Sequence, residues 1–281
     1  MMKTVVIVGA GGKMGARAAE KLAGRSEYRV LLCENNPDRA LALERMGWHV
    51  TPLGEALPVA DFVLLAAPDA LIGRISAECV PHMRSRGTLI MLDAAAAYVG
   101  ELPERADITM MITHPCHPPF FTEQATQEAR RDYFGGIAVQ DILVSLISGS
   151  KEEFAAGLEL CQVVFAPVRQ AHRVTPEQFA LLEPAMSEIV VATAATLMRA
   201  SLDAAIGKGV PREAAEAFMA GHAQIALAIV FGAEKSPFSD AARLAIEWGT
   251  KEIIRPDWKR VFEPEVLKEA IGTMLHPAQA S

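Results

Sequence analysis

Seven short apolar runs recur along the first 173 residues, with helix-like stretches between several of them. Their hydrophobic residues are almost continuous rather than alternating, which is typical of strands buried on both faces of a sheet. The pattern predicts an α/β domain over residues 1–173, built on a Rossmann-like, parallel, doubly wound sheet. The runs occupy residues 3–8, 28–33, 59–67, 87–92, 108–112, 142–147 and 168–172.

No strand-like run follows residue 173. Thr175, Pro176 and Glu177 combine an N-cap, a first-turn proline and a first-turn acid, so they predict the start of a helix. We expect Pro184 to kink or restart this helix, which then continues to about residue 205. The pattern predicts an all-α second domain over residues 174–281, with further helices over 211–231, 240–248 and 264–274.

A glycine-rich turn follows the first strand directly, in the pattern G-x-x-G-x-M-G. Glycines let the backbone turn tightly and approach a pyrophosphate, whose charge lies on the N–H groups that begin the next helix. The residues expected to bind the dinucleotide here are Gly9, Gly11, Gly12, Lys13, Met14 and Gly15. The alternative is a glycine-rich turn that only opens an ordinary α/β domain.

The second strand ends at Glu34, 19 residues past Gly15 (34 − 15). An acid at this position would hydrogen-bond the adenosine ribose hydroxyls and repel a 2′-phosphate, which favours NAD over NADP. Lys13 would instead favour NADP, since a basic side chain in the loop could help to hold a 2′-phosphate. Asp69, after the third strand, is expected on the nicotinamide side of the cofactor.

The composition narrows the class of protein. A formal charge of −7 argues against binding to nucleic acids or anionic membranes. The four cysteines are scattered and include no C-x-x-C pair, which indicates reduced thiols. The chain enters its first strand at once, so no signal peptide is expected, and the apolar stretch 225–231 is too short to span a bilayer, which takes about 20 residues. We therefore expect a cytoplasmic protein.

The most distinctive loop is Thr113-His-Pro-Cys-His-Pro-Pro-Phe-Phe121, directly after a strand. Its prolines make it rigid, and it should share the carboxyl-end edge of the sheet with the glycine loop. His114 and His117 could serve as general bases, substrate ligands or metal ligands, or could only hydrogen-bond the backbone. Cys116 could be a soft ligand, although a small buried residue is the simpler interpretation.

Glu183 stands inside an apolar helical segment beside Pro184. A carboxylate there is costly unless it is paired or bound to a cation, so Glu183 is a candidate for the same site; the alternative is an acid on the polar side of the helix. His222 lies between Phe218 and Ile225 at helical spacing and is interpreted as a core histidine.

These motifs resemble the 6-phosphogluconate-dehydrogenase-like superfamily. Within it, the His loop and the F-A-L-L-E-P segment at 179–184 resemble a family of NAD-dependent oxidoisomerases of branched sugar-acid breakdown. The resemblance implies oxidation of a hydroxyl group coupled to a metal-assisted carbon shift. The stretch 183–197 lacks the Lys and Asn of decarboxylating relatives, and Ser187 breaks the D-x-x-x-E magnesium pair of ketol-acid reductoisomerases.

His114, His117 and Glu183 are therefore the expected catalytic and metal-binding residues. A mixed nitrogen and oxygen set suits zinc best, with magnesium or manganese as the other choices. Two alternatives remain open: a metal-free NAD-dependent hydroxyacid dehydrogenase that uses a histidine as base, and a non-catalytic NAD-sensing protein. Alanine-rich helices over 185–205 and 214–231 predict a homodimer, as the resemblance also implies.

Overall fold

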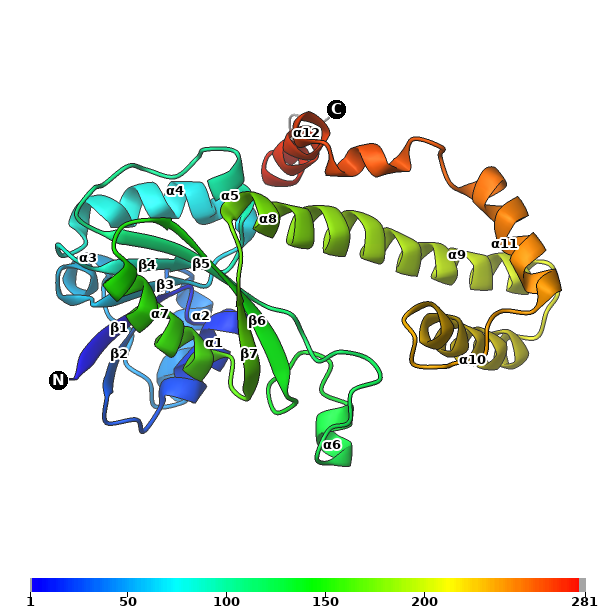
Figure 1. Cartoon of the computed structure of the whole chain (residues 1–281). Helices are drawn as coiled ribbons and strands as arrows, with labels where there is room; N and C mark the ends of the chain where they lie inside the picture. Colours follow the sequence, from blue (N-terminus) through cyan, green and yellow to red (C-terminus); the bar gives the residue numbers. More distant parts are fainter. Residues whose placement is uncertain (1, 278–281) are drawn as a thin grey trace. The chain divides into compact units, whose positions relative to one another are not determined.

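The structure is a computed structural model that describes residues 2–277 (Figure 1). Its chain forms two compact units, one of Met1–Glu183 with Lys268–Ser281 and the other of Pro184–Leu267. The first unit contains a seven-stranded sheet in the order β2-β1-β3-β4-β5-β6-β7. The strands are β1 Lys3–Val8, β2 Tyr28–Cys33, β3 Phe62–Leu65, β4 Thr88–Met91, β5 Thr109–Pro115, β6 Gln140–Ser148 and β7 Val168–Arg173.

The first five strands in this order are parallel, and their carboxyl ends lie at one edge. Val8 at the end of β1 pairs with Cys33 of β2 and with Leu65 of β3. Leu65 in turn pairs with Met91 of β4, which pairs with Ile112 of β5. The predicted Rossmann-like sheet is confirmed, with β6 and β7 as the exceptions, because β6 runs antiparallel to β5 and β7 runs parallel to β6.

Helices cover both faces of the sheet, as the continuous apolar strands predict. Val5 and Ile7 of β1 pack in one core cluster with α1 (Lys13–Leu22) and α7 (Lys151–Val164). Val6 and Val8, which point to the opposite face, pack in a second cluster with α4 (Asp69–Cys79) and Phe179 of α8 (Pro176–Ala180). The shorter helices of this unit are α2 Pro37–Arg45, α3 Leu53–Ala56, α5 Ala95–Tyr98 and α6 Gln127–Arg130; α12 spans Pro264–Leu275.

Helix α8 belongs with the sheet rather than with the helices that follow. Its start carries the expected Thr175 cap, extended to a capping box with Gln178, and its Phe179 is fully buried. The division between the compact units therefore falls at Glu183 and Pro184, later than the limit expected after residue 173. Residues 268–277 also belong to the first unit, where Ile271 is buried.

The second unit is helical. A π-helix covers Leu181–Ala192 and contains Pro184, followed by α9 Thr193–Gly207, α10 Arg212–Val230 and α11 Asp240–Ile253. Pro184 thus lies inside continuous helical backbone, in π-helical turns, rather than at a restart of the helix.

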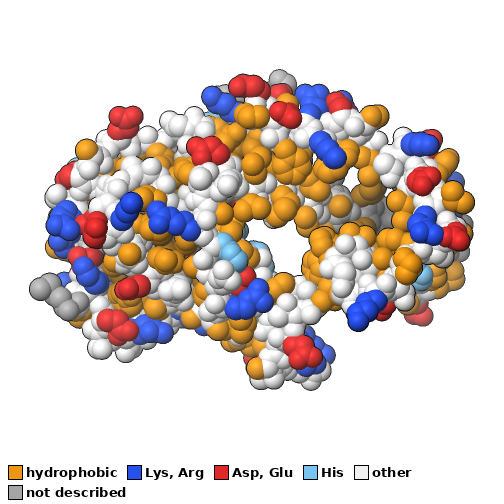
Figure 2. Space-filling view, in the orientation of Figure 1, with side chains coloured by type: hydrophobic (Ala, Val, Ile, Leu, Met, Phe, Trp, Pro, Cys, Tyr) orange, Lys and Arg blue, Asp and Glu red, His pale blue; other side chains and the backbone are white. Residues whose placement is uncertain are grey.

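The helices of the second unit expose much apolar surface (Figure 2). Phe218 and Val230 of α10 are both 66% exposed, and so is Trp248 of α11. Within the described chain, one helical segment, Pro176–Gly207, is long and apolar enough to cross a membrane, judged by length and composition alone. Of its most apolar 18-residue stretch, 6% is buried. Exposed apolar surface of this kind is typical of an interaction site.

Candidate functional site

The glycine loop has the geometry that a bound dinucleotide requires. Gly9 has a φ of +81°, and a Cβ added there would lie 2.5 Å from the Ala66 carbonyl oxygen. A Cβ on Gly15 would lie 2.3 Å from the Gly9 carbonyl oxygen, so the strand, loop and helix can approach only through glycine. Helix α1 begins at Lys13 without a side-chain cap, which leaves its first N–H groups for an anion such as a pyrophosphate.

Glu34 lies directly against this loop. Its Oε2 accepts a hydrogen bond from the Gly11 N–H at 2.9 Å, and its Oε1 accepts one from the Asn36 N–H at 2.9 Å. Gly11 leaves no room for a side chain, since an added Cβ would lie 2.6 Å from Cβ of Arg39. The carboxylate is therefore fixed at the end of β2, where an adenosine ribose lies in Rossmann folds.

Two further acids follow the neighbouring strands. Asp69 opens α4, and although it is exposed, the protein around it desolvates its carboxyl group; together with the charge of Asp93 this raises the pKa of Asp69 to about 6. Asp93 follows β4 and is 2% exposed. Its Oδ1 accepts a hydrogen bond from the Ala95 N–H at 2.6 Å, while its Oδ2 is buried without a hydrogen-bond partner among the described residues.

His114, near the end of β5, is held by two acceptors. Its Nδ1 lies 2.8 Å from the Leu92 carbonyl oxygen and 3.0 Å from Oε1 of Glu183. Both partners accept hydrogen bonds, so Nδ1 carries the proton and Nε2 of the neutral ring is the acceptor. Desolvation lowers the pKa of His114 from its ordinary value of 6.5, which favours this neutral form.

Glu183 is a buried member of this site, 7% exposed, and not an acid on the polar side of the helix. Its second oxygen, Oε2, lies 3.3 Å from the Ala94 N–H, so it links His114 to the segment that follows β4. A carboxylate that hydrogen-bonds one ring nitrogen of a histidine fixes the orientation of the ring and makes the other nitrogen more basic. This is the role that the geometry gives Glu183.

His117 lies beside His114, with 6.1 Å between the ring centroids and an interplanar angle of 89°. Its backbone has a φ of +58°, an unfavourable conformation for a residue with a side chain, and its Nδ1 is buried without a hydrogen-bond partner in the described structure. Desolvation, followed by the charge of His114, lowers the pKa of His117. His114 thus lies beside both Glu183 and His117.

Two sequence-based interpretations are wrong. Cys116 is exposed, because its loop turns to the surface after the Cys116 N–H bonds the Asp141 carbonyl oxygen at 2.9 Å; all four cysteines are free thiols. His222 is also exposed rather than in the core; it stacks on Phe218, with ring centroids 3.8 Å apart. Helical spacing alone misplaced His222, since the apolar face of α10 is open in the single chain.

Among residues 2–277, no group of three or more His, Cys, Asp and Glu side chains is arranged to hold a metal ion. The two oxygens of Glu183 face His114 and the Ala94 N–H. A metal bound by His114, His117 and Glu183 together therefore stays a prediction.

The sequence pattern did not single out Asp93 as a site residue. The available signal was the position of Asp93 directly after a strand, on the same edge as His114.

A Rossmann-type sheet, a glycine loop shaped for a pyrophosphate and a His–Glu pair with a buried carboxylate on the same edge define an NAD-dependent oxidoreductase of the 6-phosphogluconate-dehydrogenase type. In agreement, residues 122–275 match the family model described as phosphogluconate dehydrogenase (decarboxylating) C-term.

Full-length relatives are more specific. The chain is 42% identical to a D-apionate oxidoisomerase of Cupriavidus necator, covering 96% of this chain and 99% of the relative. It is also 42% identical to a D-apionate oxidoisomerase of Blautia hydrogenotrophica, covering 99% and 98%. The chain belongs to the D-apionate oxidoisomerase family.

A solved structure agrees with this membership. It is described as a semialdehyde dehydrogenase NAD-binding protein from Cupriavidus necator in complex with calcium and NAD, and it is 41% identical with a TM-score of 0.92, covering 96% of this chain and 99% of that one.

Proposed function

We propose that the protein is an NAD-dependent oxidoisomerase that converts D-apionate to 3-oxo-isoapionate. The observation that carries the proposal is the His114–Glu183 pair, which leaves Nε2 of His114 as an acceptor on the edge where the glycine loop lies. The activity in the names of the relatives supports the substrate. Glu34 supports NAD rather than NADP.

The reaction begins with an oxidation. Nε2 of His114 accepts the proton of the hydroxyl group next to the substrate carboxylate, and the hydrogen on that carbon leaves as a hydride to NAD, giving NADH and a 2-oxo acid. Because desolvation lowers the pKa of His114, the ring is neutral and able to act as this base near neutral pH. Glu183 stabilises the imidazolium that forms.

An isomerisation follows. The neighbouring tertiary alcohol loses its proton and becomes a ketone, while a hydroxymethyl group migrates with its bonding electrons to the 2-oxo carbon. The former ketone oxygen becomes an alkoxide and takes a proton, so the step is balanced without a further reactant. His117 lies beside His114 and is the residue that we assign to this second centre.

A divalent metal belongs to this proposal. The buried Nδ1 of His117, which has no partner among the described residues, is an imidazole donor that fits zinc, with magnesium or manganese as alternatives, while Nε2 of His114 stays free to act as the base. Substrate oxygens would complete the coordination, and Glu183 would orient His114 rather than bind the ion. Such an ion would polarise the ketone oxygen during the carbon shift.

The test is product analysis. We expect purified protein with NAD and D-apionate to form NADH, seen as absorbance at the NADH band, and a rearranged acid identified by carbon NMR. An unrearranged 2-oxo acid would instead identify a simple hydroxyacid dehydrogenase. NAD binding without turnover of D-apionate or a panel of linear sugar acids would identify an NAD-sensing protein.

We also propose that the protein is a cytoplasmic homodimer. The second unit exposes large apolar side chains that a second copy would cover, among them Phe218, Leu244 and Trp248. Light scattering should give about twice the chain mass of 30.2 kDa. A monomer at micromolar concentration, or recovery of the protein in the membrane fraction, would contradict this assignment.

A further inference from the structure

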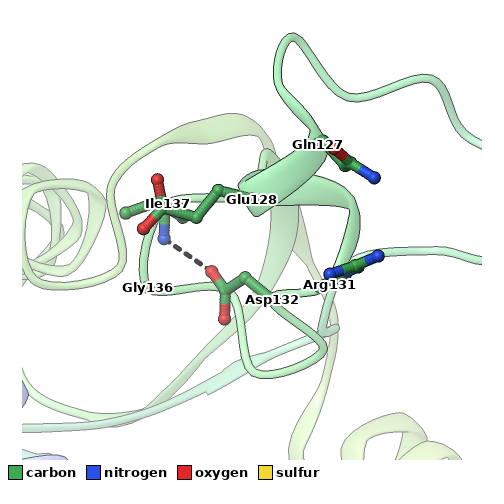
Figure 3. A pocket seen from close by; sticks show the side chains of 6 residues that line it. All are labelled: Gln127, Glu128, Arg131, Asp132, Gly136 and Ile137. Carbon is green, nitrogen blue, oxygen red and sulfur yellow. Dashed lines mark hydrogen bonds between the residues drawn. The ribbon is translucent and has the colours of Figure 1, made fainter.

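A turn after β5 is built on one aspartate. Oδ1 of Asp132 accepts a hydrogen bond from the Gly135 N–H at 3.1 Å, and Oδ2 accepts from the N–H groups of Ile137 at 2.6 Å and Ala138 at 3.0 Å. Figure 3 shows Asp132 beneath α6, in a surface pocket that also includes Glu128. Three backbone hydrogen bonds to one carboxylate fix the path of residues 134–138.

Hydrogen bonds join this turn to helix α1. Nη1 of Arg17 donates to the Phe134 carbonyl oxygen at 3.0 Å, and Nη2 donates to that of Gly135. Nζ of Lys21 donates to the Gly136 carbonyl oxygen at 2.8 Å. Lys13, Arg17 and Lys21 are spaced four residues apart, so they share one face of the helix that begins at the glycine loop.

The Phe134 side chain contacts both halves of the candidate site. Nζ of Lys13, in the glycine loop, lies 3.1 Å from the centroid of the Phe134 ring. The ring of His117 packs against the same phenyl group in a T-shaped arrangement, with centroids 5.2 Å apart and an interplanar angle of 69°. One aromatic side chain thus joins the residue expected at the pyrophosphate to a residue of the histidine loop.

We propose that Phe134 is a positioning residue that couples the dinucleotide loop to His117. The inference rests on the proposed function for its kinetic consequences, but the contacts themselves do not depend on the substrate. His117 needs external support, because its φ of +58° persists only where neighbouring groups hold it. Lys13 needs it as well, because a flexible ammonium side chain held over a ring loses less freedom when an anion binds.

Phe134→Leu removes the ring and keeps an apolar side chain. We expect kcat to fall about tenfold or more, because small displacements of catalytic groups cost large factors in rate. The Kd for NAD should rise only about two- to fivefold, the factor that an exposed cation–π contact supplies. The fold should be retained, since Phe134 is 46% exposed.

Matched variants distinguish a positioning role of the Phe134 ring from a general loss of structure. Phe134→Tyr keeps the ring and should restore both kcat and NAD affinity. Tyr133→Leu removes the neighbouring ring, which is 78% exposed, and should leave both unchanged. In a Lys13→Met background, Phe134→Leu should no longer alter the Kd for NAD, because the two changes remove one interaction.

A measurement without substrate distinguishes this inference from the proposed function. With carbon-labelled histidine, ADP-ribose, which has the pyrophosphate but lacks the nicotinamide ring, should shift the ring resonance of His117 in the wild type and in Phe134→Tyr, but not in Phe134→Leu. This coupling is expected even if D-apionate is not the substrate. Phe134→Met, of similar volume, replaces the Leu variant if that variant unfolds. Equal kinetics and equal NMR responses in Phe134→Leu and Tyr133→Leu would overturn the inference.

Discussion

Glu183→Gln is the most direct test of the proposed His–Glu pair. The side chain keeps its shape but exchanges one acceptor oxygen for an NH2 donor. In the wild type, one oxygen of Glu183 accepts from Nδ1 of His114 at 3.0 Å and the other from the Ala94 N–H at 3.3 Å. A glutamine can satisfy only one of these donors, and its own NH2 group then faces the other.

The magnitude follows from these contacts. A hydrogen bond to a charged group contributes about 1.5–3 kcal/mol, and each 1.4 kcal/mol corresponds to a factor of ten. If the charge of Glu183 stabilises the imidazolium of His114 mainly in the transition state, kcat should fall about 10- to 150-fold. The buried donor left without a partner should also lower the free energy of unfolding by about 1–3 kcal/mol.

The assay is NADH formation from D-apionate at saturating NAD, with unfolding measured separately in a denaturant titration. Glu177→Gln is the matched control, because Glu177 lies on the preceding helix α8 and is exposed. It should match the wild type in both measurements. A Glu183→Gln enzyme with kcat within twofold of the wild type would refute the assigned role of the carboxylate.

Four other predictions follow from single contacts. Glu34→Ala should reduce the preference for NAD over NADP by about tenfold in kcat/KM, through loss of the ribose hydrogen bond; a wild type that prefers NADP would contradict the assignment. The acid limb of kcat/KM should lie below pH 6.5, because desolvation lowers the pKa of His114, and a limb above pH 7 would argue against His114 as base. The hydrogen bond from Arg169 lowers the pKa of Asp141 from 3.8 to about 2. The contribution of this ion pair to the stability of the fold should therefore be complete above pH 4 and should be lost as the pH falls towards 2. Because Arg169 is half exposed, Asp141→Asn should cost only about 1 kcal/mol at pH 7 in a urea titration, with no cost at pH 2. EDTA should abolish isomerisation and zinc should restore it, whereas metal-free protein with full activity would exclude a metal-assisted shift.

The sequence predicted most of the sheet because buried strands leave a strong local signal. The run 3–8 and the observed strand Lys3–Val8 coincide, and the glycine loop lies where its pattern requires. Strand direction leaves no such signal. The apolar run 142–147 belongs to β6, which is antiparallel to β5. The run itself does not indicate this direction, because the direction of a strand depends on the length and path of the connection before it.

Phe134 shows why the roles of loop residues are hard to predict from a sequence. The segment between β5 and β6 has no hydrophobic period, so nothing in the sequence distinguishes Phe134 from the neighbouring Tyr133. The difference arises from Asp132, whose carboxylate sets the turn, and from Arg17, which fastens it to α1. Such contacts join residues far apart in the chain, and a single sequence does not record them.

Glu183 is an intermediate case, in which a usable signal was present. Phe179 precedes it by four residues, so the two side chains lie on the same face of a helix, and Phe179 is fully buried. A buried aromatic residue at that spacing implies that the carboxylate is buried too, and a buried carboxylate requires a partner. The parallel sheet then restricts the choice, because it brings the residues after β4 and β5 to one edge, where His114 and the Ala94 N–H lie. Helical spacing and strand order together therefore lead to the His–Glu pair, although neither does so alone.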